Sequence, residues 1–130
     1  MEQHLKGIPE TLLIPLWARA VEFRHSDPIF VDFKAIDMMK HIEYDFTKFD
    51  SEWATQISIA VRTEILDNAT KAFIHKNPDS VIVNIGCGLD TRYSRIYTGK
   101  IRWYDDLDLP ESIKLKESDS LKNGSISHDS

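Results

Sequence analysis

The spacing of hydrophobic and polar residues predicts helices in the first part of the chain. Apolar residues recur at helical spacing from Pro9 to about Arg24, and Pro15 either interrupts this helix or marks its first turn. A second helix is predicted over residues 29–41, with Asp27 as its N-cap and Pro28 at the first helical position.

A longer third helix is predicted from about Glu52 to His75. Asn77-Pro78 follows it, and a proline at this place ends a helix. Its apolar residues form a stripe, which consists of Ile57, Ala60, Val61, Ile65, Ala69, Ala72 and Phe73. We expect the helix to pack beside the strand that follows it in the sequence.

The pattern then changes to strand, turn, short helix and strand. An apolar, β-branched run over residues 80–85 ends at Gly86 and Gly88, and a second apolar run over residues 101–104 ends in an acidic cluster. This order is typical of the first strand of a nucleotide-binding α/β unit. Gly86 permits a tight turn, and Gly88 allows the main chain to approach a ligand.

The glycine pattern is not a complete dinucleotide fingerprint. A third glycine would stand at position 91, where this sequence has Thr91, and its absence disfavours NAD and FAD. A ligand with a ribose but no phosphate fits better, and S-adenosylmethionine is the common one. Asp108 lies about 20 residues beyond the glycines, the spacing of a carboxylate that binds ribose hydroxyls, and Asp106 is its competitor. A structural turn without a ligand is the alternative interpretation.

The segment Asn84–Arg92 resembles the leucine carboxyl methyltransferase family, together with Arg62 upstream and Asp106–Glu111 downstream. That family includes tetracenomycin-type polyketide O-methyltransferases and belongs to the class I S-adenosylmethionine-dependent enzymes. The similarity runs from about Thr11 to about Lys116 and covers the first half of the family's pattern. It implies an α/β, Rossmann-like S-adenosylmethionine-dependent methyltransferase fold, truncated, with N-terminal helices before the first strand.

The resemblance implies a set of cofactor-binding residues, which are Arg62, Gly86, Gly88, Asp90, Asp106 and Asp108. The glycine amides would line the methionine part, and one of the two later aspartates would bind the ribose diol. Arg62 would bind the cofactor's carboxylate through a bidentate guanidinium, or it forms an ordinary surface ion pair with Glu64 or Asp67. Asp90 either contacts the cofactor's amino group or holds the glycine loop. Arg92 would be a structural partner to a helix end or to an acidic side chain.

Composition narrows the class of protein. The chain has 130 residues, a formal net charge of −5 and one cysteine. An acidic chain without a basic stripe is not expected to bind nucleic acid, and the lone cysteine excludes an internal disulfide. Cys87 has no histidine placed to activate it, and the five histidines lack metal-ligand spacing, so we expect no metal site. Without a signal sequence or membrane span, we expect a cytoplasmic protein.

The sequence therefore divides into an N-terminal helical cap (1–45), the N-terminal half of a cofactor-binding domain (46–116) and a disordered tail (117–130). The predicted activity is methyl transfer to the carboxylate or hydroxyl oxygen of a small molecule or a protein. No catalytic base is identified. We expect the chain alone to bind the cofactor weakly or not at all, and self-association or a partner chain to complete the sheet. The alternative is a non-catalytic helical interaction module with a vestigial nucleotide-binding turn.

Overall fold

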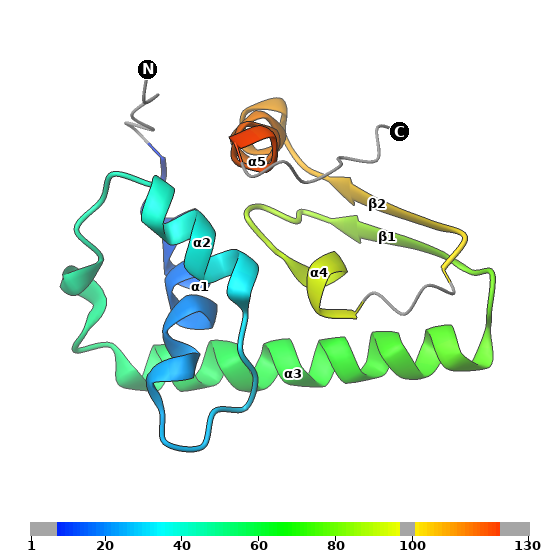
Figure 1. Cartoon of the computed structure of the whole chain (residues 1–130), viewed down its shortest axis with the longest axis horizontal. Coiled ribbons are helices and arrows are strands. Elements are labelled where there is room, and N and C mark those ends of the chain that lie inside the picture. Colours follow the sequence, from blue (N-terminus) through cyan, green and yellow to red (C-terminus); the bar gives the residue numbers. More distant parts are fainter. Residues whose placement is uncertain (1–7, 97–100, 123–130) are drawn as a thin grey trace.

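The computed structural model describes residues 8–96 and 101–122 and has an α/β architecture (Figure 1). The first helical elements are α1 (Glu10–Ala20), the 3-10 helix η1 (Val21–Arg24), α2 (Phe33–His41), the 3-10 helix η2 (Phe46–Phe49) and α3 (Trp53–Lys76). They are followed by β1 (Val81–Ile85), α4 (Arg92–Ile96), β2 (Trp103–Leu107) and α5 (Pro110–Lys122). This order confirms the predicted succession of helices and a strand–turn–helix–strand unit.

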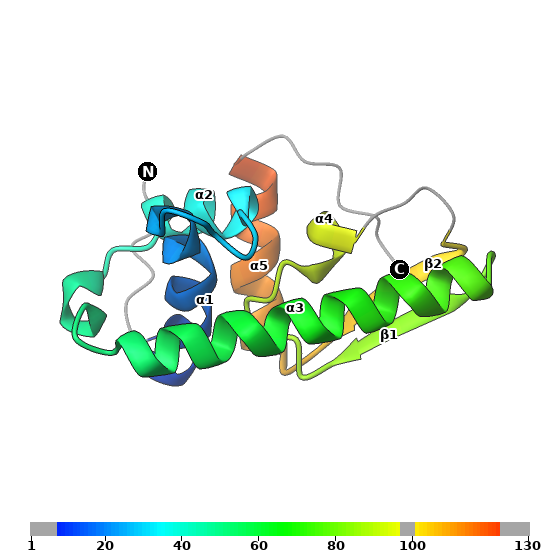
Figure 2. The ribbon, with the colours of Figure 1, turned by 90° about the horizontal axis from the view of Figure 1, so that it is seen from below.

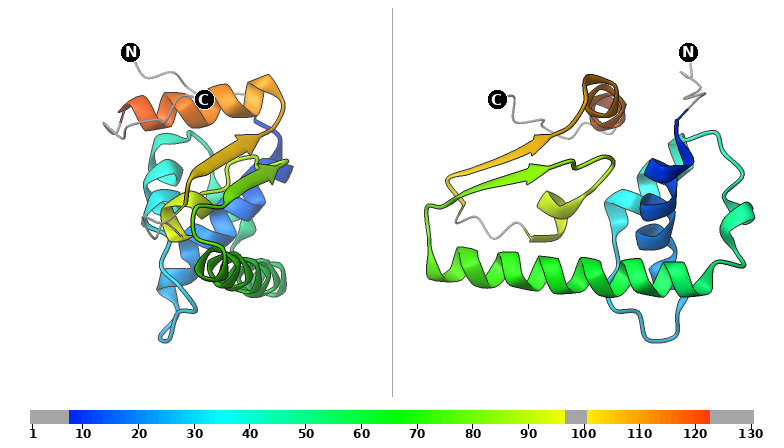
Figure 3. Two further views of the ribbon diagram at one scale, coloured as in Figure 1. Left: turned by 90° about the vertical axis from the view of Figure 1, so that its right-hand side faces the viewer. Right: turned by 180° about the vertical axis from the view of Figure 1, so that it is seen from behind.

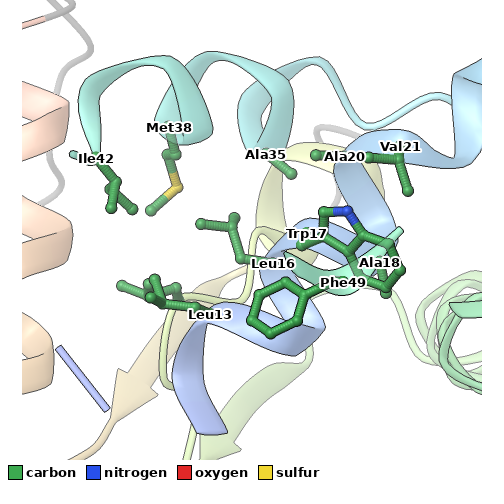
Figure 4. Close-up of a cluster of buried hydrophobic side chains, with 11 residues drawn as sticks. Leu13, Leu16, Trp17, Ala18, Ala20, Val21, Ala35, Met38, Ile42 and Phe49 are labelled. Atoms are coloured by element: carbon green, nitrogen blue, oxygen red, sulfur yellow. The ribbon is translucent and has the colours of Figure 1, made fainter. Parts of the chain in front are cut away.

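The main hydrophobic core lies between α1 and α2 (Figure 4). Its buried members are Leu13, Leu16, Trp17, Ala18, Ala20, Val21, Ala35, Met38, Ile42, Phe49 and Leu89. Each large aliphatic side chain buried there contributes about 1.5–3 kcal/mol to stability. Leu89 comes from the loop that follows β1, so the core of the helical cap also fixes that loop.

The long helix α3 connects the cap to the sheet, because α1 packs on it and α4 contacts it further along (Figures 1 and 2). Its end agrees with the prediction. The backbone and side-chain nitrogens of Asn77 donate to the Phe73 carbonyl at 2.9 and 3.0 Å, which satisfies a carbonyl in the last turn.

The side chains that α3 buries are mostly not those of its apolar stripe. The buried ones are Gln56, Ala60, Thr63, Asp67 and Ile74, whereas Ile57, Val61, Ile65 and Phe73 are exposed. Ala60 alone belongs to both sets. The physical reason is that α3 packs on the cap and on α4 through a hydrogen-bonded polar face, so the stripe points to the other side.

The two strands form a parallel sheet in which Val81 pairs with Trp103 and Ile85 with Leu107. One face of the sheet contacts α4, since the rings of Tyr93 and Tyr104 lie 5.1 Å apart. The other face presents apolar side chains that are about half exposed or more, namely Val81, Val83, Ile85, Trp103 and Leu107. Figure 3 shows the sheet from its end, with α3 and α4 on the same side of it.

Three predicted boundaries were wrong. The helix predicted over residues 29–41 begins at Phe33 with Asp32 as N-cap, because Asp32 accepts the Ala35 amide proton. The second strand continues through the acidic residues to Leu107, since the ladder with β1 holds them in extended backbone. A helix continues to Lys122, beyond the start predicted for the disordered tail, and residues 123–130 of that tail lie outside the described residues.

Candidate cofactor site

The glycine turn lies at the carboxyl ends of both strands. Gly86 and Gly88 have φ angles of +66° and +52°, a left-handed conformation that L side chains rarely adopt. The amides of Gly86 and Cys87 donate to the Leu107 carbonyl at 2.7 and 3.2 Å, which fixes the turn against the end of β2. In parallel α/β sheets this edge is where ligands bind.

The two glycines differ in the space around them. A Cβ added to Gly86 would have no described heavy atom within 4 Å beyond its chain neighbours, so its Cα faces open space. A Cβ on Gly88 would meet the Cδ2 atom of Leu12 at 3.1 Å. Helix α1 therefore covers the turn at Gly88, and Gly86 offers the side from which a ligand approaches.

Asp108 lies beside this turn, directly after β2. Its Oδ2 accepts the Gly88 amide proton at 2.6 Å, and its Oδ1 accepts that of Leu109 at 2.6 Å. The hydrogen bonds from Leu109 and Gly88 lower the pKa of Asp108. The carboxylate stays charged and keeps unshared lone pairs, which suits it to accept hydrogen bonds from a diol.

Asp106 lies within β2 and has a different partner. Its Oδ2 accepts from the ammonium group of Lys116 on α5. Its Oδ1 is buried and has no hydrogen-bond partner among residues 8–96 and 101–122. Of the two candidates for the ribose, Asp108 is therefore the one that contacts the glycine turn.

Asp90 is held by several partners rather than facing outward. Its carboxylate accepts from Asn84 at 3.0 Å and from Arg95 at 3.1 Å, and Arg92 lies 3.3 Å away. Burial alone would raise the pKa of Asp90, but the guanidinium groups of Arg19, Arg95 and Arg92 outweigh it and lower that pKa to about 2. Asp90 is thus a charged anchor of the loop.

The anchor extends to α3 through two arginines of α4. The Arg95 guanidinium binds both carboxylate oxygens of Asp67, with Nε–Oδ2 and Nη2–Oδ1 distances of 2.6 and 3.1 Å. Arg92 reaches the same carboxylate at 3.2 Å and the Asn84 side chain at 3.3 Å. The Arg95 and Asp67 side chains are only 8% and 4% exposed, so this is a buried bidentate ion pair.

The same group of charges reaches the helical cap through Asp32. Its Oδ2 accepts from Arg95 at 2.8 Å and also from the Thr91 hydroxyl. The Arg19 Nε lies 3.4 Å from Asp32, and Arg19 Nη2 donates to the Leu89 carbonyl at 2.8 Å. We call the six charged residues of this group the buried charge network; they are Arg19, Asp32, Asp67, Asp90, Arg92 and Arg95.

Sequence reasoning missed most of this network. It named Asp67 only as a surface partner for Arg62 and left the role of Arg92 open between a helix end and an acid. A signal was present, because Ala60, Asp67 and Ile74 recur at seven-residue spacing and so share one face of α3. An aspartate between two buried apolar residues of one helix face requires a buried partner.

Two further predictions concern single residues. Arg62 lies on α3 with an exposed side chain, so its contact with the cofactor stays a prediction. Cys87 is buried between the glycines, and burial raises the pKa of its thiol to about 11. A thiol with a raised pKa is a poor nucleophile, so the Cys87 side chain is not suited to a catalytic role.

Comparison with known proteins identifies the family. The model of the leucine carboxyl methyltransferase family matches residues 13–126. The chain belongs to the leucine carboxyl methyltransferase family. The tetracenomycin polyketide synthesis O-methyltransferase TcmP of Streptomyces glaucescens is 32% identical to it over 112 residues, which are 86% of this chain and 42% of that protein.

A second relative matches the chain with the same identity and to a similar extent. The S-adenosyl-L-methionine-dependent methyltransferase dpfgK of Gibberella zeae is 32% identical over 122 residues, covering 86% of this chain and 41% of that protein. This leucine carboxyl methyltransferase family chain therefore spans about two fifths of the length of both curated relatives. The predicted family is confirmed, and S-adenosylmethionine is confirmed as the cofactor at the level of the family.

Neither a metal-binding cluster nor a membrane-spanning helix is found in the described residues. Residues 8–96 and 101–122 contain no group of three or more histidine, cysteine or carboxylate side chains arranged to hold a metal ion. No helix in this part of the chain combines the length and apolar composition needed to cross a membrane.

Proposed function

We propose that this chain is the cofactor-binding N-terminal part of an S-adenosylmethionine-dependent O-methyltransferase. The proposal rests above all on one observation: the glycine turn at the carboxyl ends of β1 and β2 leaves Gly86 open, and the charged Asp108 carboxylate binds the Gly88 amide of the same turn. An unobstructed backbone beside a carboxylate suits a ligand that combines an amino-acid part with a ribose. Family membership supports the same interpretation.

Each residue of the site would then have a stated task. Backbone atoms at Gly86 and Gly88 would line the methionine part of the cofactor, and Asp108 would accept both ribose hydroxyls. Asp90 would hold the loop, since its charge is already balanced by three guanidinium groups. Arg62, whose side chain is exposed on α3, would bind the cofactor's carboxylate.

When bound, S-adenosylmethionine would supply an electrophilic methyl group on a sulfonium. The chain's own contribution would be to orient the cofactor and to exclude water from it, which is catalysis by positioning. A carboxylate acceptor needs no general base, whereas a hydroxyl acceptor does. We infer an oxygen acceptor on a small molecule or a protein carboxylate, and TcmP, an O-methyltransferase by name, supports the first.

The exposed apolar face of the sheet and the stripe of α3 support a second part of the proposal. Parallel sheets are normally covered on both faces, and here β1 and β2 leave one face open within the described residues. Both relatives are more than twice as long as the matched region. We propose that further strands and helices of a methyltransferase domain cover this surface, in a cytoplasmic protein. A second copy of the chain is the competing occupant.

A nuclear magnetic resonance titration tests the cofactor assignment. S-adenosylmethionine added to the 15N-labelled full chain should shift the amide signals of Gly86 and Gly88, with weak affinity of about 1 mM, or about −4 kcal/mol. Asp108→Asn keeps the shape of the side chain but removes its charge, and it should weaken binding at least tenfold. Asp105→Asn, on β2 just before Asp108, is the matched control and should bind as the wild type does.

The same titration separates the two functional classes. If the folded chain shows no shift at Gly86 or Gly88 at several millimolar cofactor, the cofactor assignment fails. The chain would then be better described as a helical interaction module with a vestigial nucleotide-binding turn. Equal weakening by Asp105→Asn and Asp108→Asn would show that the loss reflects altered charge on the strand rather than a ribose contact.

A further inference from the structure

Arg95 contacts more separate parts of the molecule than the cofactor proposal requires. Its guanidinium binds Asp67 on α3, Asp32 at the N-cap of α2, and both Asp90 and the Thr91 hydroxyl in the loop after the glycines. Five N–H groups in a rigid plane make an arginine able to join three carboxylates at once. A lysine at this position would keep the charge but not this geometry.

The carboxylates that Arg95 binds are each committed to a second element. Asp32 caps α2 through the Ala35 amide at 2.9 Å, and it lies next to Arg19, which holds the Leu89 carbonyl. Asp90 accepts from Asn84 of β1. The loop from Cys87 to Thr91 is therefore tied at both sides, to the cap through Asp32 and to the sheet through Asn84.

The charges of the buried charge network balance, with three arginines and three aspartates. The Asp32, Asp67 and Arg95 side chains are 1%, 4% and 8% exposed, so water does not compensate for a lost partner. Removing the planar guanidinium of Arg95 would leave the buried carboxylates of Asp32 and Asp67 incompletely paired. The part of the structure that can respond most easily is the loop, because Gly86 next to it faces open space.

We propose that Arg95 is a positioning residue, which together with Asp67 holds the glycine loop in the conformation that leaves Gly86 open to the cofactor and keeps the Gly88 amide on Asp108. The inference rests on the proposed function for the identity of the ligand, but the loop coupling itself is a property of this chain. The helical cap and the loop form one unit through Arg95. Loss of the Arg95 guanidinium opens the glycine loop locally while the rest of the chain stays folded.

Cys87 provides a direct reporter of that opening. It is the single cysteine of the chain, it lies between the two glycines, and it is 6% exposed with a raised pKa. Iodoacetamide reacts with the thiolate, so the alkylation rate of Cys87 measures how often the loop opens. Rates are measured without cofactor, in urea from zero to just below the unfolding transition.

Arg95→Lys should raise the Cys87 alkylation rate by on the order of tenfold, and the rate should depend little on urea. Local opening exposes little surface, so the alkylation rate then depends little on urea. If the variant only lowers global stability, the alkylation rate rises with urea as steeply as global unfolding does. Asp67→Asn is the second variant, which removes charge without changing size and should act in the same direction. Arg102→Lys, an exposed arginine before β2, is the matched control and should leave the rate unchanged.

Two results would overturn the proposal. One is an alkylation rate in both variants no higher than in Arg102→Lys. The other is a raised alkylation rate whose urea dependence equals that of global unfolding, which would mean that Arg95 only stabilises the fold. If Arg95→Lys does not fold, the alkylation rate of Asp67→Asn is used for the same test. These alkylation rates are measured without cofactor, so the two proposals can fail separately. If the Gly86 and Gly88 signals do not shift with cofactor but Cys87 is alkylated faster in the Arg95 and Asp67 variants, the proposed function is rejected and the loop coupling stands.

Discussion

The two faces of α3 depart from the usual relation between polarity and burial, because three of the five side chains that it buries are polar. The face toward the cap and α4 buries Gln56, Thr63 and Asp67, while the opposite face exposes Ile57 and Ile65 at 41% and 60%. Polar side chains are buried here because each has a partner. Gln56, for example, donates to the Ala18 carbonyl at 3.0 Å and to Glu22 at 2.7 Å.

This difference shows that the two faces of α3 have different structural roles. The polar face specifies one arrangement of cap, loop and helix, because misplaced charges would be buried without partners. The apolar face has no such specificity and is suited to burial against another surface. In the proposed function, the polar face of α3 anchors the glycine loop through Asp67 and Arg95, and the apolar face is the surface that further elements of the domain would cover.

The largest expected effect comes from breaking the polar face. Asp67→Ala removes the carboxylate that binds both Arg95 and Arg92, and it leaves the buried Arg95 and the partly exposed Arg92 guanidinium without this partner. We expect the free energy of unfolding to fall by about 3–5 kcal/mol, measured by urea denaturation. Because an apolar-to-alanine change in a core costs a similar amount, this aspartate would rank with core residues.

Glu64→Ala is the matched control for that variant, on the same helix. Glu64 makes a surface hydrogen bond with Asn68 at 3.1 Å, so its loss should cost less than about 0.5 kcal/mol. If the two variants lose similar stability, Asp67 is not part of a cooperative buried network, and the contrast between the faces of α3 is wrong.

A smaller effect is expected from pH. The pKa of Asp90 is lowered from 3.8 to about 2 in the folded chain, so its contribution is complete above about pH 4 and is lost as the pH falls through about 2. A pKa shift of this size corresponds to about 2 kcal/mol of folding free energy. Urea unfolding of the wild type and of Asp90→Asn should therefore differ at about pH 6, and the difference should shrink by about 2 kcal/mol at about pH 2.

The physical reason for this convergence is that protonated Asp90 resembles asparagine. Neither can balance the three guanidinium groups that face it, from Arg19, Arg92 and Arg95. A difference between wild type and Asp90→Asn that stays constant from pH 6 to pH 2 would mean that the charge of Asp90 does not stabilise the fold. It would also weaken the proposal that Asp90 anchors the glycine loop.

The parts of the site predicted from sequence are those determined by local chemistry. Gly86 and Gly88 were recognisable because left-handed backbone favours glycine, and Asp108 because the length of the β1–β2 unit sets its spacing. The end of α3 followed from Asn77-Pro78. Each of these signals lies within a few residues of the feature that it predicts, or at a fixed distance along one motif.

The parts that sequence reasoning missed depend on contacts between distant segments. Asp67 and Arg95 are 28 residues apart and Asp32 and Arg95 are 63 apart, so neither pairing is visible in local spacing. The same holds for the N-cap of α2. Asp27-Pro28 had the better local signature, but Asp32 is held by Thr91 and Arg95, and these tertiary contacts decide where the helix begins.

The smallest expected effect on stability comes from changing the apolar face. Ile57→Lys and Ile65→Lys replace side chains that are already substantially exposed, so the free energy of unfolding of dilute protein should change by no more than about 0.5 kcal/mol. Binding of a hydrophobic dye should fall, because exposed apolar area is removed. A loss above about 2 kcal/mol that appears only at high protein concentration would identify a second copy as the occupant of this face. The same loss in dilute protein would show that the stripe is buried within the chain itself, and the contrast between the two faces of α3 would not hold.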